Sequence, residues 1–190
     1  DMGLRRIMYG YFKVVVLGNY LVGDKFTTII DKIEHTSWLY NYLDTLHYGT
    51  LLYLRFAGYS DIAIGFALLL GFRVMENFNL PFLASNIVDF WRRWHISLST
   101  WCKDYVYVPV LSFTRVPFIA ALASMIILGI WHEMSWRYLL WGAFHGIGIA
   151  VCQRWQRNEM AKTLLNNRTW TFIAFLITQN FVIFSFTFTG

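Results

Sequence analysis

The stretch Val116-Pro-Phe-Ile-Ala-Ala-Leu-Ala-Ser-Met-Ile-Ile-Leu-Gly-Ile-Trp131 contains no charged residue and ends directly before His132. An apolar run of this kind is typical of a helix that crosses a bilayer, which needs about 20 apolar residues. Further apolar segments lie at residues 7–22, 46–72, 134–153 and 170–189. Together these segments predict an all-α, polytopic transmembrane helical bundle.

The composition agrees with a membrane protein. Of the 190 residues, 57% are hydrophobic and 19% are aromatic, which lies outside the usual range for a soluble domain. A net charge of +5 could indicate nucleic-acid binding, but the basic residues lie between the apolar runs. That placement is typical of loops that orient helices and contact anionic lipid. We therefore expect membrane lipid as a partner and no nucleic acid.

The domain organisation is expected to be simple. No domain boundary is visible, so residues 1–190 are interpreted as a single membrane-embedded core. The sequence opens at Asp1 and ends at Gly190 directly after an apolar run, and we expect it to be a fragment of a longer chain. Residues 24–45 mix charged and aromatic side chains and are interpreted as a loop or an interfacial helix.

A second amphipathic region follows residues 73–83, where asparagines and Pro81 end the preceding helix. A new helix is predicted to start at Ser85 or Asn86 and to continue past residue 100. On helical spacing its apolar stripe is formed by Ile87, Trp91, Trp94, Leu98 and Trp101. The adjoining polar face holds Arg92, His95, Ser99 and Cys102. This pattern predicts one amphipathic helix that lies partly in the membrane interface or against a polar cavity.

Several ionisable residues interrupt the apolar segments. His132 ends a run where an ionisable side chain must face protein or water, and a neutral imidazole there can act as a base. His95 has Arg92 and Ser99 one turn to either side, which would give its imidazole a hydrogen-bonding partner and a positive field; periodicity alone favours instead a simple hydrogen bond to a neighbouring helix. Arg55 and Asp61 must meet partners or water; each could tie its helix to a neighbour, and a catalytic role is the alternative.

A metal centre is not expected. His132-Glu133 begins a zinc-protease helix motif, but Trp136 stands where that motif needs its second histidine. A centre built from His95, His132 and His145 would require tertiary contact that the spacing does not favour. The two cysteines, Cys102 and Cys152, indicate neither a disulfide framework nor a metal site.

Five motifs then occur in order along the chain. They are Gly58-Tyr-Ser-Asp-Ile-Ala-Ile-Gly65, Glu76-Asn-Phe-Asn-Leu-Pro-Phe82, Asp89-Phe-Trp-Arg-Arg-Trp-His-Ile-Ser-Leu-Ser-Thr-Trp-Cys-Lys-Asp-Tyr105, Gly129-Ile-Trp-His132 and Trp141-Gly-Ala-Phe-His-Gly146. Together they closely resemble the membrane-bound O-acyltransferase (MBOAT) family. The nearest branch is the bacterial one that contains alginate O-acetylases and the teichoic-acid D-alanyl transfer protein. The resemblance is expected to run from about Arg5 to about Arg154, with the final segment similar only in being hydrophobic.

This resemblance implies the core of a longer MBOAT fold in a bacterial inner membrane. The implied activity is transfer of an acetyl or D-alanyl group to a hydroxyl of an extracytoplasmic polysaccharide or teichoic-acid-like polymer. The donor would be a thioester, acetyl-CoA or an acyl carrier protein, with no bound cofactor, and an extracytoplasmic partner acyltransferase could complete the transfer. An alternative is a non-catalytic membrane transport or assembly subunit for envelope polymer export.

The resemblance also assigns roles to residues. His132 matches the essential histidine and His95 matches the second active-site position. The expected substrate-contacting residues are Arg92, Trp94, Ser99, Lys103, Asp104, Tyr105 and His145, although helix packing explains His145 equally well. Two positions depart from the family's common pattern, Glu133 in place of Gly and Lys103 in place of Arg. The carboxylate of Glu133 could raise the basicity of the histidine or mark a subgroup with another substrate.

The chemistry of acyl transfer fits these two histidines. Moving an acyl group from a thioester to a hydroxyl requires removal of the hydroxyl proton and stabilisation of an oxyanion. We expect His132 to act as the general base and His95 to position the acceptor or donate to the acyl oxygen. A covalent acyl-enzyme on Cys102, activated by the neighbouring Lys103, is a further alternative.

Overall fold

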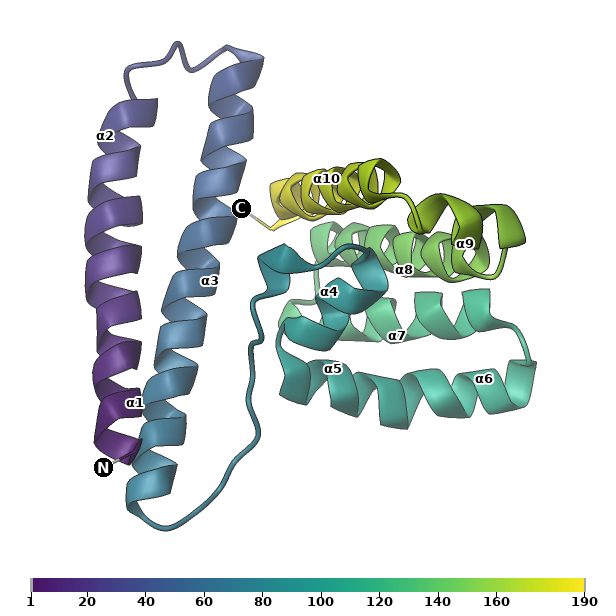
Figure 1. The fold of residues 1–190 in the computed structure, drawn as a ribbon, viewed down its shortest axis with the longest axis horizontal. Coiled ribbons are helices and arrows are strands. Elements are labelled where there is room, and N and C mark those ends of the chain that lie inside the picture. Colours follow the sequence, from purple (N-terminus) through teal and green to yellow (C-terminus); the bar gives the residue numbers. More distant parts are fainter. Residues whose placement is uncertain (1, 190) are drawn as a thin grey trace. The chain divides into compact units, whose positions relative to one another are not determined.

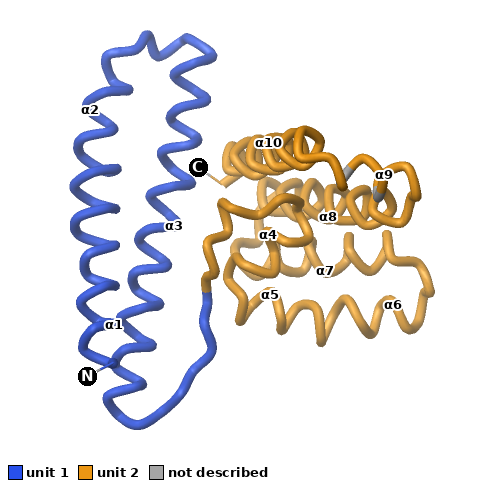
Figure 2. Tube along the Cα trace, viewed as in Figure 1, with its two compact units in different colours: residues 1–77, 190 blue, residues 78–189 orange. Residues whose placement is uncertain are grey.

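The computed structural model describes residues 2–189, and these form helices joined by turns and one longer connection (Figure 1). This confirms the predicted all-α class. The chain divides into two compact units, one ending at Asn77 and the other beginning at Phe78 (Figure 2). Each unit is described by itself below.

Unit 1 is a pair of long helical segments. Its elements are α1 (Met2–Tyr11), a π-helical stretch (Phe12–Phe26), α2 (Thr27–Ile30) and α3 (Trp38–Leu69). The first three form one continuous helical rod, and α3 lies alongside it (Figure 1). The Ser37 hydroxyl caps α3 by accepting a hydrogen bond from the backbone N–H of Tyr40 at 3.1 Å. Residues 24–45 are therefore mainly helical, and the predicted loop is confined to residues 31–37.

Glycines let the helices of unit 1 approach closely. A Cβ atom on Gly10 would lie 2.6 Å from the carbonyl oxygen of Gly58, and one on Gly3 would lie 2.8 Å from that of Gly65. Small residues at such contacts are typical of helix pairs in membranes, where close backbone packing replaces the hydrophobic effect as the main attraction.

Both charged residues inside the apolar segment 46–72 have partners on the first rod. The carboxylate of Asp61 accepts hydrogen bonds from Arg6 Nε at 2.7 Å and from Lys13 Nζ at 2.6 Å. Arg55 Nε donates to Asn19 Oδ1 at 2.9 Å. The prediction that each residue ties its helix to a neighbour is confirmed.

Unit 2 contains the remaining elements. They are a 3₁₀ turn (Pro81–Leu83), α4 (Ile87–Arg93), α5 (Ile96–Cys102), a π-helical turn (Lys103–Tyr107), α6 (Val108–Thr114), α7 (Pro117–His132), α8 (Trp136–Gln156), α9 (Glu159–Leu165), α10 (Arg168–Ser185) and a second 3₁₀ turn (Phe186–Phe188). Helices α7 and α8 form an antiparallel hairpin at the centre of the unit (Figure 1). Helix α7 covers the predicted apolar segment 116–131 and ends at His132.

The α7–α8 hairpin is packed backbone to backbone. A Cβ atom on Gly142 would lie 2.5 Å from the carbonyl oxygen of Met125, and one on Gly129 would clash with the carbonyl oxygen of Tyr138. No side chain fits at either position unless the helices separate. The position of His132, one turn after Gly129, is therefore fixed by this close approach.

The prediction of a single amphipathic helix from residue 86 past residue 100 is wrong. The start is as expected, because Asn86 Oδ1 caps α4 by accepting from the Asp89 backbone N–H at 2.9 Å. However, α4 ends at Arg93, and α5 begins at Ile96 after a break at Trp94 and His95. The apolar periodicity of the sequence continues across Trp94 and His95, so the sequence gives no sign of this break.

Among the described residues, two helices are long and apolar enough to cross a membrane, Trp38–Leu69 and Arg168–Phe188, and Pro117–His132 is a shorter apolar helix. These correspond to three of the five predicted segments. Segments 7–22 and 134–153 are helical as well. That those two and the α7 segment cross the bilayer stays a prediction.

Candidate active site

Two histidines from separate segments of unit 2 lie on either side of Trp131. The ring centroid of His95 is 6.3 Å from that of Trp131, which in turn is 5.0 Å from that of His132. The His132 side chain is exposed, and that of His95 is half-buried. The structure therefore brings together the two residues that the sequence assigned to catalysis.

The backbone at His95 is in an unusual conformation. Its φ and ψ angles are 45° and 55°, the left-handed region that residues other than glycine seldom adopt. The break is held by Ser99, whose hydroxyl donates to the Trp94 carbonyl oxygen at 2.8 Å, and the Ser99 N–H donates to the His95 carbonyl oxygen at 2.9 Å. Such outliers persist only where the surroundings impose them, and they cluster at functional sites. Here the turn directs His95 toward Trp131.

His95 is uncharged at neutral pH. Burial and the nearby His132 imidazole lower its pKa from 6.5 to about 4. A neutral ring can accept a proton at one nitrogen and donate at the other. This form suits a residue that must bind a hydroxyl or an acyl oxygen without carrying charge.

Aromatic rings surround His132. Its ring stacks on Tyr138 with centroids 5.8 Å apart and meets Trp141 edge to face at the same centroid distance. Trp141 is buried on α8 and contacts His145, with ring centroids 4.7 Å apart. The imidazole of His132 is thus supported by two rings of the neighbouring helix.

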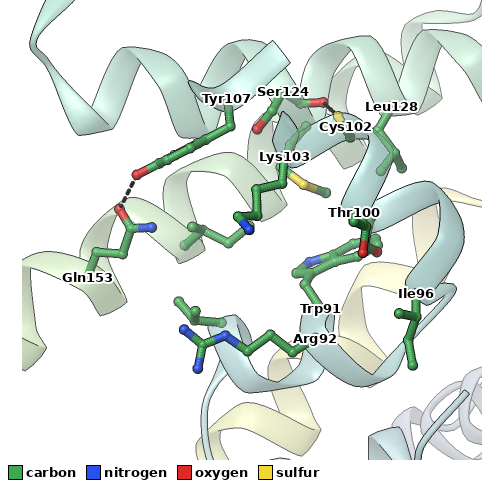
Figure 3. A pocket seen from close by; sticks show the side chains of 14 residues that line it. Trp91, Arg92, Ile96, Thr100, Cys102, Lys103, Tyr107, Ser124, Leu128 and Gln153 are labelled. Atoms are coloured by element: carbon green, nitrogen blue, oxygen red, sulfur yellow. Dashed lines mark hydrogen bonds between the residues drawn. The ribbon is translucent and has the colours of Figure 1, made fainter. Parts of the chain in front are cut away.

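Unit 2 also contains a cavity of about 410 Å³, whose lining includes Ile96, next to His95 in the chain, but neither His95 nor His132 (Figure 3). Its lining combines apolar and polar side chains from α4, α5, the π-helical turn, α7 and α8: Val88, Trp91, Arg92, Ile96, Ser99, Thr100, Cys102, Lys103, Tyr107, Ser124, Met125, Leu128, Ile149 and Gln153. Two cations, Arg92 and Lys103, belong to this lining, and the Tyr107 hydroxyl donates to Gln153 Oε1 at 3.4 Å. A cavity with apolar walls and a few polar and cationic groups fits a chain-like ligand that carries negative charge.

The predicted substrate-contacting residues divide into two groups. Arg92, Ser99 and Lys103 line the cavity. Trp94 does not, because it is buried in a cluster with Phe78, Phe82, Phe90 and Phe186.

Three more of these residues lie outside the cavity lining. Asp104 and Tyr105 are exposed, and Asp104 lies 3.6 Å from Lys103 Nζ. His145 is only 1% exposed. Substrate contact therefore stays a prediction for four residues: Trp94, Asp104, Tyr105 and His145.

Cys102 is placed unfavourably for covalent chemistry. Its side chain is buried, and its thiol donates to the Ser124 carbonyl oxygen at 3.0 Å. Burial raises the pKa of this thiol to about 11. Lys103 was expected to activate this sulfur, but its ammonium group points away from Cys102 (Figure 3). The reactive thiolate is thus scarce at neutral pH.

Sequence reasoning missed Trp91, Trp141 and Gln153 as parts of the site. Trp91 was assigned to an apolar stripe, although its indole N–H donates to His145 Nδ1 at 3.3 Å. A buried tryptophan usually needs a partner for its N–H, and this need is the one signal that could have marked it. Gln153 lies on α8 near its C-terminal end, and nothing in its local sequence distinguishes it.

Comparisons with known proteins place these observations in context. The profile of MBOAT, membrane-bound O-acyltransferase family, matches residues 2–190. The chain is 37% identical to a probable alginate O-acetylase of Azotobacter vinelandii over 96% of the chain and 36% of that protein. It is 33% identical to the teichoic acid D-alanyltransferase of Bacillus subtilis over 97% of the chain and 49% of that protein.

A third relative is the peptidoglycan O-acetyltransferase of Helicobacter pylori, which is 35% identical over 95% of the chain and 34% of that protein. The chain thus spans about a third to a half of the length of these relatives. The match also extends through the final segment to residue 190, so the expectation that the resemblance ends near Arg154 is wrong.

Proposed function

Because the chain belongs to the membrane-bound O-acyltransferase family, we propose that it is the catalytic part of an integral membrane O-acyltransferase of a bacterial inner membrane. It moves an acetyl or D-alanyl group from a thioester, acetyl-CoA or an acyl carrier protein, to a hydroxyl of an extracytoplasmic envelope polymer. Its relatives are named for acetyl transfer to alginate or peptidoglycan and for D-alanyl transfer to teichoic acid.

The observation that carries the proposal is the convergence of His132 and His95 beside Trp131. In the proposed reaction, His132 removes the proton of the acceptor hydroxyl as its oxygen attacks the thioester carbon. The C–O bond forms, and the carbonyl electrons move onto oxygen. Neutral His95 then donates a hydrogen bond to that oxyanion. Such a donor is typically worth about 100- to 1,000-fold in rate.

The intermediate collapses by breaking the C–S bond. The electron pair leaves with sulfur, and the His132 imidazolium returns its proton to the thiolate, so the enzyme ends in its starting state. General-base help of this kind contributes about 100- to 10,000-fold. The exposed edge of His132, at the end of α7, gives both substrates access to the ring.

The cavity supports the donor assignment. Its apolar walls suit the extended arm of a thioester, and Arg92 and Lys103 supply positive charge for the phosphate that such an arm carries in coenzyme A and in acyl carrier proteins. Arg92 lies on α4 and Lys103 begins the π-helical turn, so both cations come from the stretch of chain that also carries His95.

The test is complementation of a null strain with the full-length protein, followed by measurement of O-acyl groups on the envelope polymers. The variants are His132→Ala and, as a control, His35→Ala, which removes an exposed histidine in the turn of unit 1. With membrane levels matched, we expect wild type and His35→Ala to restore acylation and His132→Ala to abolish it.

Equal restoration by His132→Ala would overturn the role of this histidine. Failure of the wild type as well, with the protein present in the membrane, would overturn the acyltransferase assignment and favour a transport or assembly subunit. Mild base releases the O-acyl groups from the polymers. The released acid identifies the acyl group, and the polymer fraction that releases it identifies the acceptor.

A further inference from the structure

A buried hydrogen bond joins α4 to α8 behind the candidate active site. Trp91 Nε1–H donates to His145 Nδ1 at 3.3 Å, and the two rings meet edge to face with centroids 5.3 Å apart. Trp91 is 9% exposed and His145 is 1% exposed. The bond is therefore shielded from solvent.

The bond fixes which nitrogen of His145 carries a proton. An indole N–H only donates, so Nδ1 must be the unprotonated, accepting nitrogen. The neutral ring then carries its proton on Nε2. Within residues 2–189, this buried Nε2 has no hydrogen-bond partner. Its ring instead lies among Trp141, Phe144 and Phe181.

The same pair contacts both parts of the candidate site. Trp91 forms part of the cavity wall. Trp141 lies between the pair and the catalytic histidine, with ring centroids 5.8 Å from Trp91, 4.7 Å from His145 and 5.8 Å from His132. Rotation of any one of these rings would displace its neighbours, because the packing leaves little free space.

We propose that Trp91, Trp141 and His145 form a positioning unit that sets the orientation of the His132 imidazole and of the cavity wall, with the Trp91–His145 hydrogen bond locking its geometry. The proposal rests on the proposed function. In this proposal the three residues act through the His132 ring, which Trp141 contacts, and not on the reacting atoms themselves. This role explains why a histidine that is only 1% exposed stands on α8.

The kinetic test uses purified full-length protein with a thioester donor and a soluble acceptor glycan. Trp91→Phe keeps the ring and removes the donor N–H, and His145→Asn keeps an acceptor near the position of Nδ1. His145→Gln places its amide near Nε2 instead. Trp136→Phe, which alters an exposed tryptophan of α8, is the matched control.

We expect Trp91→Phe and His145→Gln to lower kcat per folded molecule by about 10- to 100-fold, since a displacement of about 1 Å can cost about 100-fold. His145→Asn should retain more activity than His145→Gln, and Trp136→Phe should match wild type. If both Trp91→Phe and His145→Gln lower only the amount of folded protein, with kcat unchanged, the pair is merely structural and the proposal is wrong.

A second measurement does not depend on activity. With ¹⁵N-labelled histidine, we expect NMR of the wild type to show His145 with an unprotonated Nδ1 and a protonated Nε2. We also expect the His132 ring signals to shift in Trp91→Phe and not in Trp136→Phe. The opposite tautomer, or unshifted His132 signals, would overturn the positioning unit. If the wild type transfers no acyl group while these signals behave as expected, the proposed function fails and the positioning geometry stands.

Discussion

The ion cluster of Asp61 in unit 1 allows a stability prediction to be worked out from the structure. The Asp61 side chain is 5% exposed, and its two oxygens bind Arg6 and Lys13, each at 2.6 Å. Asp61→Asn keeps the size of the side chain but removes the charge that compensates two cations. Lys13, 18% exposed, would then lose the salt bridge that ties it to α3.

The cost follows from the environment of each partner. Removing one member of a buried ion pair usually costs about 3–5 kcal/mol, because a buried charge is left uncompensated. Arg6 is 31% exposed and also pairs with Glu76, so part of its charge stays compensated. Solvent screening lowers the expected loss in the free energy of unfolding to about 2–3 kcal/mol.

The assay is equilibrium unfolding of the full chain in detergent micelles, followed by circular dichroism. Asp89→Asn is the control, because Asp89 pairs only one turn along α4 with Arg93 at 2.9 Å and is 24% exposed. We expect that variant to lose about 0.5–1 kcal/mol. Adding Lys13→Met to Asp61→Asn should recover part of the loss. If Asp61→Asn costs no more than Asp89→Asn, or if the double variant is simply additive, the reasoning fails.

Three further predictions concern unit 2. Gly142→Leu should separate α7 from α8, because even a Cβ there would lie 2.5 Å from the Met125 carbonyl oxygen; thermal unfolding should show a marked loss of stability, and an unchanged midpoint would contradict the packing. Cys102→Ser should retain acyl transfer per folded molecule, because burial raises the thiol pKa to about 11; complete loss of activity in a folded variant would restore the acyl-enzyme alternative. Since His95 has its pKa lowered from 6.5 to about 4, the unfolded chain takes up a proton first as the pH falls. The free energy of unfolding should therefore decrease from pH 6.5 to pH 4, with a shallower slope in His95→Gln; equal slopes would contradict the shift.

The sequence by itself determined the class of the fold and the main catalytic candidate. Uninterrupted apolar runs leave a backbone little choice but helix in a membrane, because each N–H and C=O must be paired within its own segment. His132 at the end of such a run is recognisable because an ionisable side chain there must face protein or water. The need of Asp61 and Arg55 for partners was also readable from the sequence, because charge in an apolar segment is costly.

Only the tertiary structure decided which residues meet. The break at His95 could not be predicted, because helical periodicity continues through it and the left-handed turn depends on Ser99 and on the packed segments around it. The contact of Trp91 with His145 joins residues far apart in the chain, and the burial of His145 follows from rings of three helices. Local patterns record what a segment prefers, whereas a site is made of contacts between segments, and these depend on the packing of the whole unit.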